Sequence, residues 1–286
     1  MTVTPIIMNY NLPNITDEIY TILESNGFEN IISIDNGSDI EPRASSSNFI
    51  LPKNVRVSGQ ARMALIYLMD YFPSDYYLLI NNSGKLLSEI NYKDIIEKDI
   101  KKINKILSKK KKLGVLVSSL LGESAQKDLP YQIPSKEYEY SSFFSPQPIC
   151  MAISHDLLGI CRKNSSSVFN LDLFRGHGIG PELLYEANCN GFLNIISSNF
   201  YVDWISNRGY NINKGGEEKS KYHDLAGDEM KMSFCKKYGY FWRYKFYFRF
   251  YLNTLIFRNN KKLLIFYDNI LSKIYSKLQI KGFITK

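Results

Sequence analysis

The segment Tyr76-Tyr77-Leu78-Leu79-Ile80-Asn81-Asn82-Ser83-Gly84 decides the fold class of this chain. Its first five residues form a continuous apolar run, which is typical of a strand buried in the centre of a parallel sheet. The run ends in Asn, Asn, Ser and Gly, residues that favour turns. The segment therefore predicts a central parallel strand that leads directly into a polar loop.

The residues before this segment alternate between two kinds of element. Val3–Met8 and Asn30–Ile34 are predicted strands, and Asn14–Asn26 has apolar residues at helical spacing. Val55–Ser58 predicts a short strand, and Gln60–Tyr71 predicts a buried helix. Strands alternating with helices predict an α/β fold with a doubly wound, mostly parallel sheet.

The residues after the segment continue the pattern less regularly. Lys93–Lys112 predicts a lysine-rich surface helix, and residues 122–148, with four prolines, predict a long irregular loop. Ile149–Ser154 and Phe192–Ile196 are predicted strands, with a helix over Gly180–Asn190 between them.

Composition excludes several classes of protein. The 286 residues are 44% hydrophobic and 22% charged, which argues against disorder. The four cysteines are widely spaced, so they predict neither a zinc ribbon nor a disulfide framework. The first residues do not form a signal peptide, and no apolar stretch is long enough to span a membrane. We therefore expect a cytoplasmic protein.

The positive charge is concentrated at one end. The net charge is +8, from 36 Lys and Arg against 28 Asp and Glu. Residues 231–286 carry 13 basic residues and one acid, whereas residues 1–230 carry 23 and 27. This asymmetry predicts two parts: a mildly acidic body over 1–230 and an appended surface-binding element, a basic, aromatic, helical extension over 231–286.

The extension is also rich in aromatic residues. Residues 238–257 contain 11 aromatics, with Arg243, Lys245 and Arg249 between them. One interpretation is a helix that packs aromatics on the body. The other, which we favour, is peripheral attachment to an anionic membrane surface at the inner face of the cell membrane. Nucleic acid is not an expected partner, because the body is acidic and contains no recognised nucleic-acid-binding module.

Three polar loops follow three predicted strands: Asn9–Asn11, Asp35–Asp39 and Asn81–Gly84. If the strands are parallel, these loops share one edge of the sheet, where α/β proteins bind nucleotides. The alternative is that they are ordinary turns.

Four motifs in order resemble family 2 glycosyltransferases of the GT-A fold, in particular rhamnosyl- and galactofuranosyl-transferase-like enzymes of bacterial surface glycans. They are Ile6–Asn11, Ile34–Asp39, Asn54–Ala64 and Tyr76–Ser83. The second matches the family's (V/I)-D-(N/D)-G-S-x-D loop closely. The resemblance covers about 85 residues and implies a nucleotide-binding half over 1–120 and an acceptor half over 121–230.

The resemblance implies transfer of a sugar, with inversion, from a nucleotide-sugar donor to a hydroxyl of a glycan or lipid-linked acceptor in polysaccharide or lipopolysaccharide biosynthesis. The implied donor-binding residues are Asn9, Tyr10, Asp35, Arg62, Asn81, Asn82 and Ser83.

The second half resembles the family's acceptor-binding half over Gly178–Phe192. There Glu182 is the first candidate for the base that takes the acceptor proton, and Asp172 is the second. The candidates for contacts with the leaving group or the acceptor are Arg62, Arg175, His177 and Arg208.

The chain departs from the family where that family holds its metal. The usual carboxylate falls at Ser83, the Glu-Asp pair at Ile179 and Gly180, and the late His near Ser206. A hydroxyl is a poor ligand for Mg²⁺ or Mn²⁺. We therefore assign no metal ligand, and leave a weakly held Mg²⁺ or Mn²⁺ open.

Two other functions remain as alternatives. The missing carboxylates suit a degenerate member that binds a nucleotide sugar or glycan without turnover. A sugar-nucleotidyltransferase on a related fold is the second, although the chain has no Gly-rich opening of that type.

Overall fold

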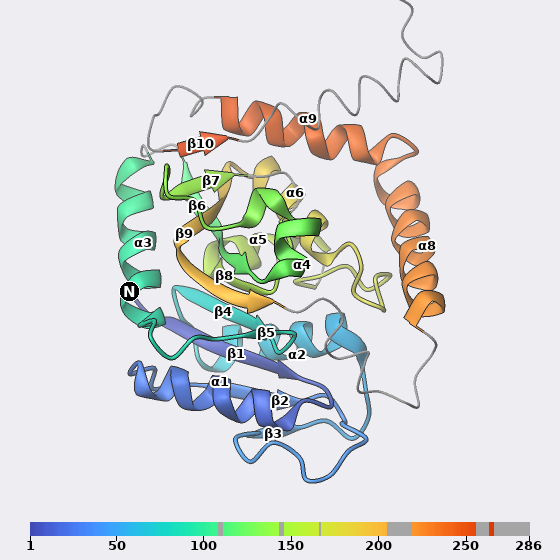
Figure 1. The fold of residues 1–286 in the computed structure, drawn as a ribbon. Helices are drawn as coiled ribbons and strands as arrows, with labels where there is room; N and C mark the ends of the chain where they lie inside the picture. Colours follow the sequence, from blue (N-terminus) through green and yellow to red (C-terminus); the bar gives the residue numbers. More distant parts are fainter. Residues whose placement is uncertain (108–110, 143–145, 166, 205–218, 256–262, 266–286) are drawn as a thin grey trace, which may run out of the picture.

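The computed structural model describes residues 1–286 except 108–110, 143–145, 166, 205–218, 256–262 and 266–286 (Figure 1). The strands are β1 (Val3–Asn9), β2 (Ile32–Asp35), β3 (Phe49–Ile50), β4 (Tyr76–Asn81), β5 (Gly84–Lys85), β6 (Lys112–Leu121), β7 (Tyr140–Ser142), β8 (Cys150–Ser154), β9 (Phe192–Trp204) and β10 (Leu263–Ile265). The helices are α1 (Pro13–Ser25), α2 (Arg56–Tyr71), α3 (Tyr92–Ile106), α4 (Glu123–Asp128), the 3₁₀ turn η1 (Pro130–Gln132), α5 (His155–Ser165), α6 (Ile179–Cys189), α8 (Lys219–Tyr238) and α9 (Trp242–Leu255).

The described strands form one sheet in the order β10-β7-β9-β6-β8-β4-β1-β2-β3, with β5 beside β9. β1 pairs in parallel with β2 and β4, and β6 pairs in parallel with β9. β8 runs antiparallel between β4 and β6. The predicted α/β fold with a mostly parallel sheet is confirmed. The reversal at β8 was not predictable, because a buried strand is apolar in either direction.

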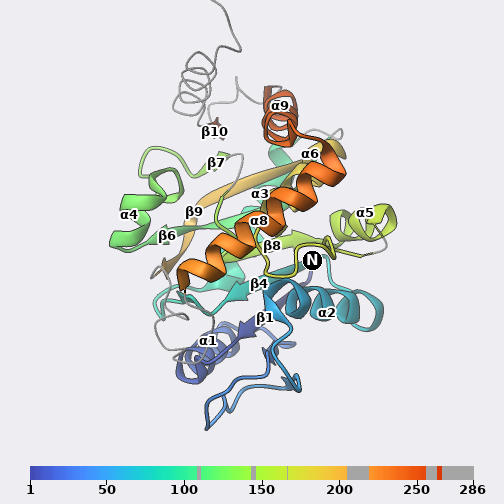
Figure 2. The ribbon, with the colours of Figure 1, turned by 90° about the vertical axis from the view of Figure 1, so that its right-hand side faces the viewer.

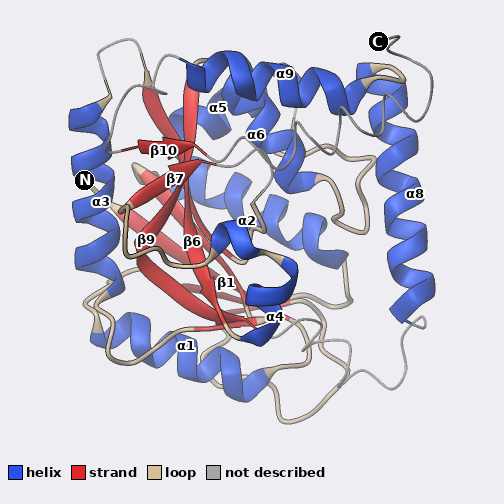
Figure 3. Cartoon of the chain, turned by 45° about the horizontal axis from the view of Figure 1, so that its top comes forward, coloured by secondary structure: helices blue, strands red, loops and turns tan. Residues whose placement is uncertain are grey.

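Helices cover both faces of the sheet, so the molecule has three layers (Figure 3). On one face α1 and α3 pack through residues such as Ile19 and Ile100. On the other face α2, α5 and α6 pack through residues such as Leu65, Leu157 and Leu183. Burial on both faces explains why the first five residues of β4 are apolar.

Three expectations need correction. The strand predicted at Val55–Ser58 is wrong, because α2 already begins at Arg56. The helix predicted over Lys93–Lys112 ends at Ile106, and Lys112 begins β6. Residues 122–148 are not one loop, since they contain α4, η1 and β7. In each case the spacing of apolar residues alone does not distinguish a helix from a strand or a loop.

The C-terminal helices frame the second half of the molecule. α8 runs along one side and α9 crosses the top (Figure 1). From the side, α8 crosses the front of the body and ends beside α6 (Figure 2). The predicted body boundary at 230/231 therefore falls inside a continuous helix.

The inner face of these helices belongs to the core. Phe234, Trp242 and Phe246 are at most 7% exposed and join the cluster that also contains α2, α5 and α6. The ring of Phe246 stacks on Tyr185 of α6, with centroids 4.0 Å apart. Packing of aromatics on the body thus accounts for this face.

The outer face of α9 remains apolar and exposed. It consists of Tyr244, Phe248 and Leu252, and Phe241 continues it just before the helix begins; these residues follow one another at spacings of three or four. None of the helices in the described part of the chain has the length and hydrophobicity needed to cross a membrane.

Candidate functional site at the carboxyl edge of the parallel strands

The ends of β1, β2 and β4 meet at one edge of the sheet. In the parallel register Asn9 lies opposite Asp35, and Met8 lies opposite Asn81. The three polar loops that follow these strands are therefore neighbours, as the sequence predicts. This edge is the place where open α/β sheets bind ligands.

A chain of hydrogen bonds joins the three loops. The Asn82 amide donates to Asn9 Oδ1 at 2.8 Å, and the Asn9 amide donates to Asp35 Oδ2 at 3.1 Å. The other Asp35 oxygen accepts the Ser38 backbone N–H at 2.7 Å. Asn9, Asp35 and Asn82 are each at most 5% exposed. They form the floor of the candidate site and fix the loops above it.

The loop after β2 requires its glycine. Gly37 has φ +63°, and a Cβ there would lie 2.4 Å from the Lys53 carbonyl carbon. Next to it, the Asn36 amide donates to Asn54 Oδ1 at 3.1 Å, and Asn36 Oδ1 accepts the Val55 N–H at 2.9 Å. The pair Asn36–Asn54 therefore holds the segment before α2 against the end of β2.

Tyr10 lies above the floor. Its hydroxyl donates to Asp39 Oδ2 at 2.6 Å. Burial, followed by the hydrogen bond with Asp39, raises the pKa of this phenol, so the hydroxyl keeps its proton and remains a donor.

Helix α2 is anchored directly to the candidate site. The buried Gln60 amide donates to Ile34 O at 2.8 Å and to Asn9 O at 3.3 Å. Arg62 is half-buried in the same helix and makes no hydrogen bond or ion pair with another described residue.

The residues after β4 do not fit a divalent metal ion. Asn82 is buried and its amide donates to Asn9 and to Thr16 Oγ1, while the Ser83 N–H donates to Asn81 Oδ1 at 3.0 Å. No carboxylate stands at 81–83, and the described residues contain no cluster of three His, Cys, Asp or Glu side chains that could hold a metal. This agrees with the assignment of no metal ligand from the sequence but does not test it.

Glu182, the first candidate for the base, lies on the first turn of α6 and is 5% exposed. Its Oε1 accepts from Lys237 Nζ at 2.8 Å, the Tyr238 hydroxyl at 2.6 Å and the Asn170 amide at 3.2 Å. Its Oε2 makes no hydrogen bond with another described residue. One oxygen thus anchors the end of α8.

The other acceptor-side candidates lie under α8. The Arg175 guanidinium pairs with Glu229 at 3.1 Å, and His177 Nε2 lies 3.3 Å from His223 Nδ1. Burial, together with His223, lowers the pKa of His177, so this imidazole is neutral. Asp172 is exposed, with its carboxylate 3.8 Å from Lys236. Arg208 and Ser206 lie outside the described residues.

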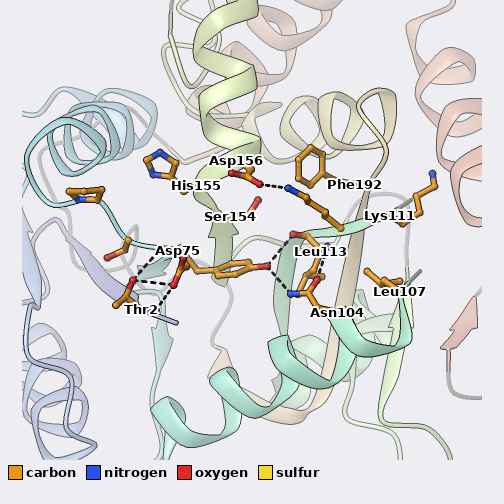
Figure 4. A pocket seen from close by; sticks show the side chains of 14 residues that line it. Thr2, Asp75, Asn104, Leu107, Lys111, Leu113, Ser154, His155, Asp156 and Phe192 are labelled. Carbon is orange, nitrogen blue, oxygen red and sulfur yellow. Dashed lines mark hydrogen bonds and ion pairs between the residues drawn. The ribbon is translucent and has the colours of Figure 1, made fainter. Parts of the chain in front are cut away.

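A cavity lies at the opposite edge of the sheet. It has a volume of about 690 Å³ and is lined where β1, β4 and β6 begin (Figure 4). Its polar groups pair with one another: Thr2 N–H with Asp75 at 2.7 Å, and Lys112 with Asp156 at 2.7 Å. Because these charges are already satisfied, we assign no ligand to it.

Some residues at the candidate site were not singled out from the sequence. Gln60, Asn54 and Arg56 lie within a recognised motif, but nothing in the letters shows that Gln60 is buried or that Arg56 has a left-handed backbone. Tyr222 approaches the site from α8, more than 160 residues further along the chain. No local pattern could have connected it with this edge.

Comparison with known proteins gives similarity in structure only. No protein-family model matches the chain, and no curated protein matches its sequence. The structure is similar to S. aureus TarS 1-349, with a TM-score of 0.51 and 16% identity over 84% of this chain and 74% of that one. For the longer S. aureus TarS structure these values are 0.50 and 14%, over 82% and 44%.

Glucosyl-3-phosphoglycerate synthase from Mycobacterium tuberculosis, in complex with Mn²⁺, uridine-diphosphate and glucosyl-3-phosphoglycerate, gives a TM-score of 0.49 at 12% identity, over 81% and 79%. Identities this low concern the fold alone, and the similarity to TarS confirms the fold expected from the four motifs. The chain has the GT-A glycosyltransferase fold.

Proposed function

We propose that this chain is a glycosyltransferase that moves a sugar from a nucleotide-sugar donor to a hydroxyl of a glycan or lipid-linked acceptor. One observation carries the proposal: the buried chain Asp35–Asn9–Asn82 brings three polar loops together at the carboxyl edge of a GT-A sheet. We expect Tyr10, Asn81, Ser83 and Arg62 to contact the donor above this floor. The expected chemistry inverts the sugar and serves polysaccharide or lipopolysaccharide biosynthesis.

The transfer needs a base for the acceptor proton and stabilisation for the leaving diphosphate. We propose Glu182 as the base, acting through Oε2, which makes no hydrogen bond with another described residue. Asp172 is the second candidate. For the leaving group, the residues at 81–83 offer no carboxylate for a metal, so we assign the stabilisation to cationic side chains and derive no step through a metal ion.

A panel of nucleotide-sugar donors tests the function, with release of nucleoside diphosphate as the readout. We expect release with at least one donor, and turnover that survives EDTA. Turnover that strictly requires Mn²⁺ would contradict the metal-independent site. Donor binding without release would instead indicate a non-catalytic binding protein, which the absent carboxylates also suit. Formation of pyrophosphate from a nucleoside triphosphate would indicate a nucleotidyltransferase.

We also propose that the outer face of α9 rests on an anionic membrane surface, at the cytoplasmic side. Support comes from the exposed stripe of Phe241, Tyr244, Phe248 and Leu252. Three cations and no acid accompany it in α9. Aromatic rings at headgroup depth with adjacent cations are typical of interfacial helices. This location would bring the enzyme to a lipid-linked acceptor.

Vesicle sedimentation tests this attachment. The double variant Phe241→Ser/Phe248→Ser should lose binding to vesicles that contain anionic lipid. Tyr71→Ser removes a comparably exposed aromatic at the end of α2 and is the matched control. Equal binding by the wild type and the double variant would exclude the α9 face. Self-association that disappears in the double variant would identify a second copy of the chain as the occupant instead.

A further inference from the structure

Arg56 has a backbone conformation that residues other than glycine rarely adopt. Its φ is +64°, in the left-handed region. Asn54 Oδ1 holds it there, since this oxygen accepts the Arg56 N–H at 2.7 Å as well as the Asn36 amide at 3.1 Å. Asn54 Oδ1 therefore holds both the loop after β2, through Asn36, and the left-handed backbone of Arg56. Such conformations persist where the surroundings enforce them, and they are concentrated at functional sites.

The conformation places Arg56 beside the candidate nucleotide site. One turn later in the same helix, Gln60 is bonded to the ends of β1 and β2. The charge of Arg56 also acts on the Tyr10 hydroxyl, where it opposes the larger effects of burial and Asp39 that raise the pKa of this phenol. Arg56 therefore lies near the Tyr10 hydroxyl.

The guanidinium of Arg56 is held next to an aromatic ring, and no carboxylate of the described residues pairs with it. Its central carbon lies 5.7 Å from the centroid of the Tyr222 ring of α8. Arg56 is half-buried, and it forms no ion pair with another described residue. A guanidinium held over an aromatic face is attracted to the ring, and this contact uses none of its N–H donors. This is the arrangement that a bidentate contact with phosphate oxygens requires.

We propose that Arg56 binds the diphosphate group of the donor, with Tyr222 of α8 as its positioning residue. The proposal rests on the proposed function. It assigns to Arg56 the contact with the leaving group for which Arg62 is the candidate from the sequence. Arg62 also makes no ion pair with another described residue, but it has no left-handed backbone, and no aromatic ring of the described residues holds its guanidinium. In a site without a metal-binding carboxylate after β4, Arg56 supplies positive charge where the leaving diphosphate develops negative charge.

Calorimetric titration with a nucleoside diphosphate and with the corresponding nucleoside tests the proposal. The variant Arg56→Gly suits the left-handed backbone, so it should fold with a melting temperature no lower than that of the wild type. We expect it to lose about 10- to 100-fold in affinity for the diphosphate. Its affinity for the nucleoside should not change. Arg56→Lys should recover part of the affinity.

Lys53→Ala removes the same charge three residues earlier, from an exposed side chain, and should bind like the wild type. Equal affinity of wild type and Arg56→Gly for the diphosphate would overturn the role of Arg56 while the glycosyltransferase function stands. An equal loss for nucleoside and diphosphate would also overturn it, because the variant would then have disturbed the base site. No binding of any nucleoside diphosphate by the wild type would overturn the proposed function itself.

Discussion

Single residues at the candidate site do two different tasks. Asn9, Asp35 and Asn82 are buried and bonded to one another, so they hold the loops in place. Tyr10 follows Asn9 in the chain and its hydroxyl donates to Asp39, while the Arg56 guanidinium lies over the Tyr222 ring; these two residues are our candidates for ligand contacts. A buried polar group that loses its hydrogen-bond partner lowers the free energy of unfolding by about 1–3 kcal/mol. This cost explains why Asn9, Asp35 and Asn82 are hydrogen-bonded to one another.

Glu182→Gln separates the chemical role of this residue from its structural role. The amide keeps an oxygen for Tyr238 and Asn170, so we expect the fold and donor binding to persist. If Oε2 accepts the acceptor proton, turnover should fall by about 100-fold or more. Initial rates and donor titrations measure the two effects. Near-normal turnover would restrict Glu182 to anchoring α8.

His177 should make stability depend on pH. Burial and His223 lower the pKa of His177 below the usual value of about 6.5. Between the folded and unfolded pKa values the unfolded chain binds more protons, so acidification in this interval favours unfolding. The free energy of unfolding of the wild type should therefore fall relative to that of His177→Gln as the pH decreases from about 7 to about 5. Parallel denaturant titrations would test this, and a constant difference would contradict it.

The sequence predicted the floor of the site better than its upper part. Asn9, Asp35 and Asn82 follow three predictable strands, and parallel pairing brings strand ends together whatever the intervening loops do. The contacts of Arg56 depend on a left-handed backbone and on Tyr222, a residue of a distant helix. Periodicity in the sequence reports neither of these.

At the scale of elements, α9 is a helix with two apolar faces. One face packs on α6 and α8, and the other is exposed. The exposed cations Arg243, Lys245 and Arg249 lie outside these two apolar faces. The aromatic content of residues 238–257 indicated two interpretations, packing and attachment. The structure assigns packing to the inner face, while attachment remains our proposal for the outer face.

Removing a ring from the inner face of α9 should destabilise the protein much more than removing one from the outer face. Phe246→Ala removes a ring that is 2% exposed and stacked on Tyr185, so it should lower the free energy of unfolding by about 3–5 kcal/mol. Phe248→Ala removes a ring that is 60% exposed and should change it by less than about 0.5 kcal/mol. Urea unfolding of both variants tests this. Equal effects would mean that the two faces are not distinct.

At the scale of the molecule, charge and chemistry are separated. Residues 1–230 have a net charge of 23 − 27, or −4, and contain the candidate donor-binding residues, whereas residues 231–286 have a net charge of 13 − 1, or +12. The predicted sheet was correct in its parallel core. The antiparallel β8 and the long reach of α8 required the tertiary structure, because both depend on partners far away in the sequence.

This separation predicts how salt affects the two activities. Vesicle binding through a basic helix should weaken steeply as ionic strength rises, because attraction between an exposed cation and anionic lipid is screened. Turnover of a water-soluble acceptor, which needs no membrane, should change much less. Sedimentation and initial rates over one salt series would compare them. Vesicle binding that does not respond to salt would contradict the electrostatic part of the attachment.

The place of α9 in the core also has a consequence for how the protein is made. Phe234, Trp242 and Phe246 close the apolar face of the layer formed by α2, α5 and α6. A ribosome synthesises that layer before α8 and α9, so these aromatics emerge after the surface that they cover. Until then the nascent chain exposes apolar surface, which makes it prone to aggregation. Chains truncated within α8 should therefore be more susceptible to proteolysis than chains that extend past α9.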